Sequence, residues 1–354
     1  MSSALPSVSQ AARWPRVALT LAIAILAGLA AQALRLPLPW MIGPLFVVAG
    51  VRMADVRLLP PKGCRHAGQW AIGTALGLYF SPAVVAQLAE HAALVVAVAG
   101  ASLLLGAVCA LVMLRHGGVD APTAFFASLP GGASEMVTLA QRAGGALDRV
   151  AAAHVLRVLM VVSVVPFALT YSGTHGDDVY TPLARHVDWA RFPLLVAASF
   201  AGIGLFRLLR LANAWVLGPL LGVGAVTALD IPLSALPPWV VNGGQLLIGC
   251  AFGCRFSRDF FRSAPRFMTV AAATALLSIA LSFGLAALLS RLAAVPLGTL
   301  SLATAPGGIA EMCITAQILQ LGVPLITACH VLRVAVLTLG AQPAFELFRR
   351  VVGG

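Results

Sequence analysis

The sequence predicts an all-α, polytopic membrane protein made of two homologous repeats. Of its 354 residues, 60% are hydrophobic and 10% are charged, whereas ordinary soluble domains have roughly 25% charged residues. The apolar residues gather in runs close to the ~20 residues that cross the hydrocarbon core of a bilayer. The same motifs also occur twice, in the same order, along the chain. Together these observations exclude a soluble globular enzyme.

Internal repetition is the strongest pattern in the sequence. Motifs of the first half return 175 or 176 residues later. The pairs are Trp40-Met-Ile-Gly43-Pro44 with Trp215-Val-Leu-Gly218-Pro219, Pro130-Gly131-Gly132-Ala-Ser-Glu135 with Pro306-Gly307-Gly308-Ile-Ala-Glu311, and His154-Val-Leu-Arg157 with His330-Val-Leu-Arg333. Self-similarity at a fixed period indicates a repeated structural unit.

This repetition sets the predicted domain boundaries. They are a cytoplasmic N-terminal segment at 1–13, a first membrane repeat at 14–171, a linker at 172–188, a second membrane repeat at 189–347 and a C-terminal tail at 348–354. The first apolar run could be a cleaved signal peptide, because Arg13 and Arg16 precede it and Ala31-Gln32-Ala33 resembles a cleavage site. Its counterpart at 192–212 argues instead for a retained helix.

Each repeat contains six apolar runs. They lie at 14–34, 36–53, 67–88, 91–114, 121–141 and 147–171, and again at 189–212, 213–229, 239–257, 267–290, 296–318 and 324–347. The second run of each repeat is short and contains Gly-Pro, at Gly43-Pro44 and Gly218-Pro219, where we expect a break because proline lacks the N–H that a helix needs. The fifth run of each repeat is interrupted by Pro-Gly-Gly.

The distribution of Lys and Arg favours an inverted arrangement of the two repeats. Short loops rich in Lys and Arg favour the cytoplasm. The loop 52–66 carries four such residues and its counterpart 230–238 has none, whereas the bias is reversed for 88–91 and 258–266. Inversion requires an odd number of crossings, so we predict five transmembrane helices plus one re-entrant Pro-Gly-Gly segment per repeat, with both termini cytoplasmic. The alternative is six crossings per repeat in parallel orientation.

Ionisable residues inside the apolar runs are the candidates for function. Burying one in a bilayer costs roughly 2.5–3.5 kcal/mol on insertion scales, and broken helices line the substrate and ion sites of many transporters. The predicted substrate-binding or ion-binding residues are therefore the two breaks and the polar residues that follow them: Pro130, Gly131, Gly132, Glu135, Gln141, His154, Arg157, Pro306, Gly307, Gly308, Glu311, Gln317, His330 and Arg333.

Two interpretations of these residues remain open at this point. In the functional one, Glu135 and Glu311 accept a proton or a cation where the two broken segments meet. In the structural one, Glu135–Arg157 and Glu311–Arg333 are ion pairs that only hold helices together. We expect no metal and no cofactor, because the six cysteines form no CxxC pair. We also expect no direct contact with nucleic acid, since the basic residues are scattered singly between apolar runs.

The duplicated Pro-Trp-Met-Ile-Gly-Pro-Leu and Pro-Gly-Gly-x-x-Glu-Met motifs resemble those of the AbrB family of Gram-negative inner-membrane proteins, over 14–347. This resemblance implies a multi-pass protein of the bacterial inner membrane that is surrounded by lipid. Family labels mention a regulator of gene expression and an ammonia monooxygenase, and neither implies catalytic residues here. A monooxygenase needs clustered metal ligands, whereas His154 and His330 occur once per repeat, so we do not expect an enzyme.

The functional expectation is a secondary transporter or exporter of a small solute, with the proton as the candidate coupling ion. The alternative is a membrane-embedded regulator of gene expression that acts indirectly, through a protein partner. A homo-oligomer is compatible with both. The sequence names neither the solute nor the partner.

Overall fold

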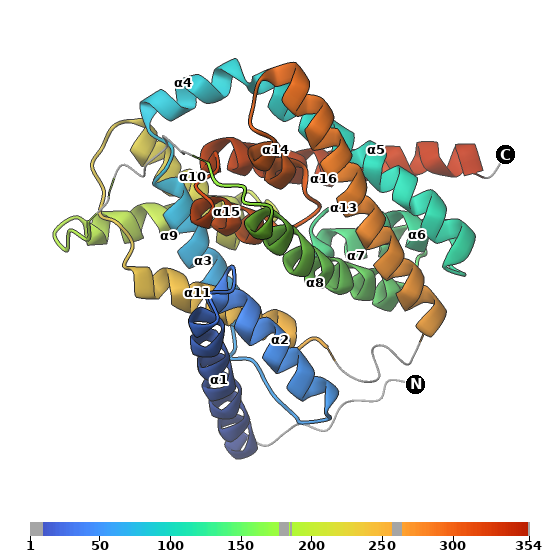
Figure 1. Ribbon diagram of the computed structural model, residues 1–354, viewed down its shortest axis with the longest axis horizontal. Coiled ribbons are helices and arrows are strands. Elements are labelled where there is room, and N and C mark those ends of the chain that lie inside the picture. The colour runs from blue at the N-terminus through green and yellow to red at the C-terminus, as the bar shows by residue number, and fades with distance from the viewer. Residues whose placement is uncertain (1–9, 177–183, 185, 257–263, 353–354) are drawn as a thin grey trace.

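The computed structural model describes residues 10–176, 184, 186–256 and 264–352, and all regular structure in these residues is helical (Figure 1). The first half forms α1 (Gln10–Ala33), α2 (Pro39–Met53), α3 (Cys64–Gly77), α4 (Pro82–Glu90), α5 (Ala92–His116), α6 (Ala121–Ser128), α7 (Ala133–Arg142) and α8 (Leu147–Tyr171). The second half forms α9 (Phe192–Leu208), α10 (Ala214–Ala228), α11 (Pro238–Gly253), α13 (Pro265–Ala293), α14 (Leu297–Thr304), α15 (Ile309–Ile318) and α16 (Val323–Val352). Part of the predicted linker 172–188, and part of the predicted loop 258–266, lie outside the described residues.

Both predicted Pro-Gly-Gly breaks are present in the structure. The first separates α6 from α7, and the second separates α14 from α15. In each case the residue before proline, Leu129 or Ala305, has an extended backbone (ψ 134° and 137°), which is the conformation that a following proline imposes. A new helix then begins after the second glycine.

Two other predictions about continuity were wrong. The Gly-Pro pairs do not break α2 and α10, although Pro44 and Pro219 are the sixth residues of these helices and each removes a backbone hydrogen bond. The close packing of α2 on α11 and of α10 on α3 is the kind of environment in which membrane helices tolerate an interior proline. By contrast, the run 67–88 is not one helix: α3 and α4 meet at 88°. The cause is local, since Ser81 caps α4 by accepting a hydrogen bond from the Val84 N–H and Pro82 follows at the first helical position.

The two halves make equivalent contacts and interlock. α2 packs on α11 as α10 packs on α3, and α5 packs on α16 as α13 packs on α8. Glycines permit these close approaches: Gly73 lies against the Val216 carbonyl, and its counterpart Gly249 lies against the Met41 carbonyl. Gly68 and its counterpart Gly244 lie against each other. Each half therefore needs the other to bury its helices.

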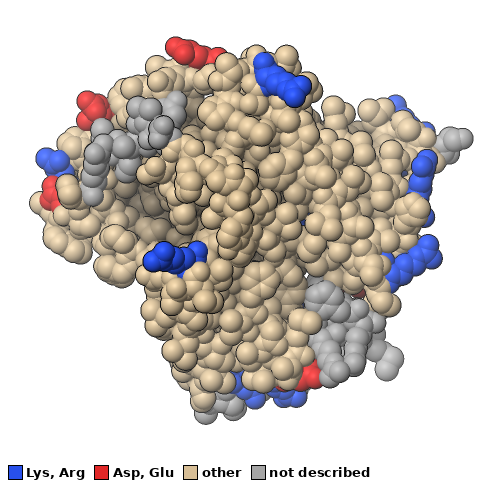
Figure 2. Space-filling model, in the orientation of Figure 1, with Lys and Arg blue, Asp and Glu red and all other residues tan. Residues whose placement is uncertain are grey.

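Length and hydropathy identify the chain as a multi-pass membrane protein. In the described residues, five helices are long and apolar enough to span a bilayer: Arg13–Ala33, Ala92–His116, Leu147–Tyr171, Pro265–Ala293 and Val323–Val352, with a sixth if α3 and α4 form one bent span. Large apolar side chains such as Leu208 and Leu339 are about 80% exposed (79% and 80%). On the face in Figure 2, the charged residues lie mainly near the edges and leave a broad uncharged surface between them. Such a surface is suited to lipid.

The glycine contacts between the halves yield a stability prediction. We expect Gly249→Val to destabilise the protein by about 1–3 kcal/mol, because the added side chain would overlap the Met41 backbone. Gly100→Val is the control, since Gly100 also lies inside a helix but a Cβ there would meet nothing within 4 Å. Thermal unfolding in detergent checks this. Equal melting temperatures for the two variants would contradict the interlocked packing.

Candidate functional site at the two broken helices

Each helix break is held by a histidine and an arginine from the second helix after it. On α8, Arg157 donates hydrogen bonds from Nη1 to the Leu129 carbonyl (2.6 Å) and from Nη2 to the Gly131 carbonyl (3.3 Å). Its Nη2 also lies 2.9 Å from His154 Nδ1, while His154 Nε2 lies 3.0 Å from the Phe126 carbonyl. The carbonyl can only accept, so Nε2–H of His154 donates to it, and the guanidinium can only donate, so Nδ1 accepts from it. With one donor and one acceptor nitrogen the imidazole is neutral.

The second break repeats this arrangement with the same sequence spacing. Arg333 on α16 donates to the carbonyls of Ala305 and Gly307 and to His330 Nδ1, and His330 Nε2 lies 2.9 Å from the Leu302 carbonyl. The last carbonyls of a helix have no partner within the helix, and leaving them unpaired in a membrane costs several kcal/mol each. The two arginines thus bind the carbonyls that the breaks expose. We call each set an Arg–His clamp.

The clamps correct the structural interpretation of the glutamates. Neither Glu135–Arg157 nor Glu311–Arg333 forms an ion pair; within the described ranges the ion pair that forms is Arg191–Asp188, on the surface. The guanidinium groups of both arginines donate their hydrogen bonds to backbone carbonyls instead. Sequence spacing suggested that each arginine would pair with a glutamate. In the structure, the groups that accept its hydrogen bonds are backbone carbonyls of the break.

The glutamates lie at the start of the helices after the breaks. Glu135 and Glu311 are the third residues of α7 and α15, whose N-caps are Gly132 and Gly308. Each carboxylate folds back over its N-cap glycine, in the space that a Cβ would occupy there. Glu311 is buried, while Glu135 is half-buried with a buried Oε2 that has no hydrogen-bond partner. The positive end of the helix dipole favours a carboxylate in this position.

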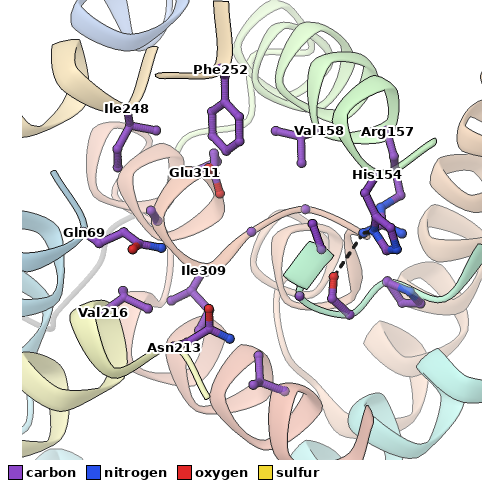
Figure 3. Close-up of a pocket in the computed structure, with 18 of the residues that line it drawn as sticks. Gln69, His154, Arg157, Val158, Asn213, Val216, Ile248, Phe252, Ile309 and Glu311 are labelled. Atoms are coloured by element: carbon purple, nitrogen blue, oxygen red, sulfur yellow. Dashed lines mark hydrogen bonds between the residues drawn. The ribbon is translucent and has the colours of Figure 1, made fainter. Parts of the chain in front are cut away.

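A cavity of about 120 Å³ lies between the two breaks (Figure 3). Of the predicted residues, its lining contains Pro130, Gly131, Gly132, His154, Arg157, Gly307, Gly308, Glu311 and Arg333. In Figure 3, His154 and Arg157 lie on the opposite side of the cavity from Gln69 and Asn213, with Glu311 beneath Phe252. The residues predicted from the two repeats therefore meet at one place, on elements from both halves.

Five predicted residues do not line this cavity. Pro306, His330 and Glu135 lie beside it in the breaks or clamps, whereas Gln141 and Gln317 lie almost two turns further along α7 and α15. Gln141 is exposed. Six residues of helix place each glutamine about 9 Å further along the helix axis than the glutamate of the same repeat, so neither glutamine reaches the cavity.

The sequence analysis missed several other residues in the lining. Among them are Arg65 and Gln69 from α3, Asn213 before α10, Ile248 and Phe252 from the end of α11, and Arg255 just after it. Gln69 had a signal, because it recurs as Gln245. Arg65 had none, because its counterpart is Val241 and it lies in a basic loop. Arg255 had a weak signal, because it lies near the end of the apolar run 239–257, but its counterpart is Tyr79, so the duplication did not mark it.

Metal ligands do not gather at this site or elsewhere in the described part of the chain. No three His, Cys, Asp or Glu side chains come together there, and the six cysteines are free thiols. The cavity itself offers one histidine and one carboxylate, and the histidine is held in its clamp.

These features define an integral membrane protein of interlocked helices with a polar cavity between two broken segments. The sequence model described as "Transition state regulatory protein AbrB" matches residues 40–349, and the chain belongs to this AbrB family. Similar proteins include the "Uncharacterized protein YhjN" of Bacillus subtilis, 28% identical over 89% of this chain and 88% of the relative. The "Putative regulator AbrB" of Escherichia coli is 26% identical over 88% of this chain and 90% of the relative. No solved structure matches the chain.

The clamps yield a second stability prediction. We expect Arg333→Met to destabilise the protein by about 1–3 kcal/mol for each of the two carbonyls, of Ala305 and Gly307, that lose their donor. Arg350→Met, at an exposed position on the same helix, is the matched control. Melting temperatures of the purified variants in detergent test this. A variant at Arg333 as stable as the control would show that the clamp does not support the break.

Proposed function

We propose that this protein is a secondary transporter or exporter of a small solute, whose binding site is the cavity between the two helix breaks. The observation that carries the proposal is the position of α7 and α15: both begin at the cavity, one from each half of the chain. Broken helices that start at a buried cavity between two repeats are the usual site architecture of secondary transporters.

Proton coupling is part of this proposal, and Glu311 is its candidate carrier. Its side chain is 4% exposed and lines the cavity. A carboxyl group in that position can hold a proton in one state of the transport cycle and release it in the other. Glu135 is the equivalent group in the first repeat.

The proposed topology is that of two inverted repeats in the bacterial inner membrane, with both termini in the cytoplasm. The equivalent packing of the two halves supports a pseudo-two-fold relation. The opposite charge bias of equivalent loops supports an axis in the membrane plane. In this arrangement the halves can exchange conformations and expose the cavity to each side in turn.

Cysteine labelling tests the inverted topology. Single cysteines at Arg57 and Ile231 lie in the loops after α2 and α10, which are equivalent in the two repeats. We expect an impermeant thiol reagent to reach position 57 from the cytoplasm and position 231 from the opposite side. Five of the six native cysteines are buried, and Cys254 should be replaced in the background. Labelling of both positions from one side would contradict inversion.

Flux through proteoliposomes tests transport. We expect the double variant Glu135→Gln, Glu311→Gln to fold normally but to lose at least tenfold of any solute or proton flux, because amides cannot exchange a proton. Internal pH and a panel of labelled small solutes are followed together. Glu90→Gln, at an exposed position on α4, is the control. Unchanged flux in the double variant would remove the glutamates from the mechanism.

The second candidate function is a membrane-embedded regulator that works through a protein partner. It is supported by the name of the Escherichia coli relative, "Putative regulator AbrB". A complete absence of flux, together with a protein partner captured through the cytoplasmic loops 52–66 or 258–266, would favour this function over transport.

A further inference from the structure

We infer that the cavity binds a small organic anion, a carboxylate with a short aliphatic part, as the solute of the proposed transporter. The inference rests on the proposed site but concerns what the site recognises. It follows from three features of the lining: its charge, its backbone donors and its apolar wall.

The charge of the lining is strongly positive. Four arginines line the cavity, Arg65, Arg157, Arg255 and Arg333, against the single carboxylate of Glu311. Arg157 and Arg333 are more than nine-tenths buried, and the Nε of each has no hydrogen-bond partner. The guanidinium groups of Arg65 and Arg255 make no hydrogen bond or ion pair in the described residues, and that of Arg255 lies over the Phe252 ring. Guanidinium groups match carboxylates geometrically, with two parallel donors.

Backbone N–H groups add to the positive electrostatic potential of the cavity. α7 and α15 begin at Ala133 and Ile309, both in the lining, and their glycine N-caps have no side chain to accept from the first-turn N–H groups. Free N–H groups at a helix start, with the helix dipole behind them, bind anions. Two such helix starts, from opposite halves, face one cavity.

The carboxylate of Glu311 indicates that the start of α15 can hold a carboxylate group. It lies over Gly308 at the start of α15, which is the position that an incoming carboxylate would use. The protein's own side chain therefore occupies the anion position, and a substrate carboxylate competes with it. A cationic substrate would instead require Glu311 as its partner and would have to approach four arginines.

Much of the rest of the lining is apolar, although Gln69 and Asn213 also belong to it. Val158, Val216, Ile248, Phe252 and Ile309 contribute side chains to it. A wall of this kind stabilises hydrocarbon, whereas a bare inorganic oxyanion would leave it in contact with water. The cavity has room for several water molecules, so the aliphatic part must be short.

Equilibrium binding to the purified full-length protein in detergent tests the inference. Titration calorimetry compares acetate, butyrate and succinate with butyramide, butylamine and sulfate. We expect at least one carboxylate to bind at least tenfold more tightly than butyramide, butylamine and sulfate. Tighter binding of the amide, the amine or sulfate, or no binding of any carboxylate, would overturn the inference.

Variants assign the binding to the cavity. Arg65→Gln and Arg255→Gln should each weaken carboxylate binding at least tenfold, whereas Arg57→Gln, in the same segment as Arg65 but outside the lining, should not. Glu311→Gln should tighten it, because the competing carboxylate is gone. Equal weakening in the Arg57 variant, or weaker binding in the Glu311 variant, would contradict the site.

The same measurements separate this inference from the proposed function. Carboxylate binding that follows the variants, without flux of that carboxylate in proteoliposomes, would refute transport and leave the anion site standing. Flux of a neutral or cationic solute, without carboxylate binding, would support transport and refute the anion site.

Discussion

The whole site depends on one requirement: the carbonyls exposed by two helix breaks inside an apolar protein must find donors. A Pro-Gly-Gly sequence ends a helix without supplying any, and the membrane offers no water to replace them. Arg157 on α8 and Arg333 on α16 supply the donors, and His154 and His330 hold each guanidinium in place. Each break is thus supported by the second helix after it, which carries the Arg–His clamp. With the carbonyls bound, the other product of each break is a helix start at the cavity, where Glu135 or Glu311 folds over the N-cap glycine.

The clamps also separate residues that the sequence had grouped together. His, Arg and Glu recur together in both repeats, which suggested one ionisable network. In the structure the His and Arg side chains bind the backbone, and the glutamates belong to the helix starts. In this division the first group supports the breaks, and in the proposed function the second group carries the proton chemistry.

Much of the fold could be predicted from the sequence, and the failures have physical causes. The helix bounds followed from apolar runs, and the Pro-Gly-Gly breaks followed from backbone chemistry. The break predicted at Gly43-Pro44 is absent, because packing against neighbouring helices can hold a membrane helix together across an interior proline. The bend between α3 and α4 was missed although Ser81-Pro82 is a normal helix start. At the site, the duplicated residues were found, but Asn213, Arg65 and Arg255 were not. They reach the cavity through the pairing of α3 with α10 and α11, which no local pattern encodes.

The last consequence concerns the two arginines that the duplication did not copy. Two identical halves would give the molecule two shapes of equal energy, related by the pseudo-two-fold axis, with no preferred direction. Val241 and Tyr79 stand at the positions equivalent to Arg65 and Arg255, so the two shapes would differ in where positive charge meets the cavity. A bound anion would then stabilise one shape more than the other. If the protein transports its solute as proposed, this divergence after duplication would make a symmetric scaffold directional, with two side chains setting the order of loading and release.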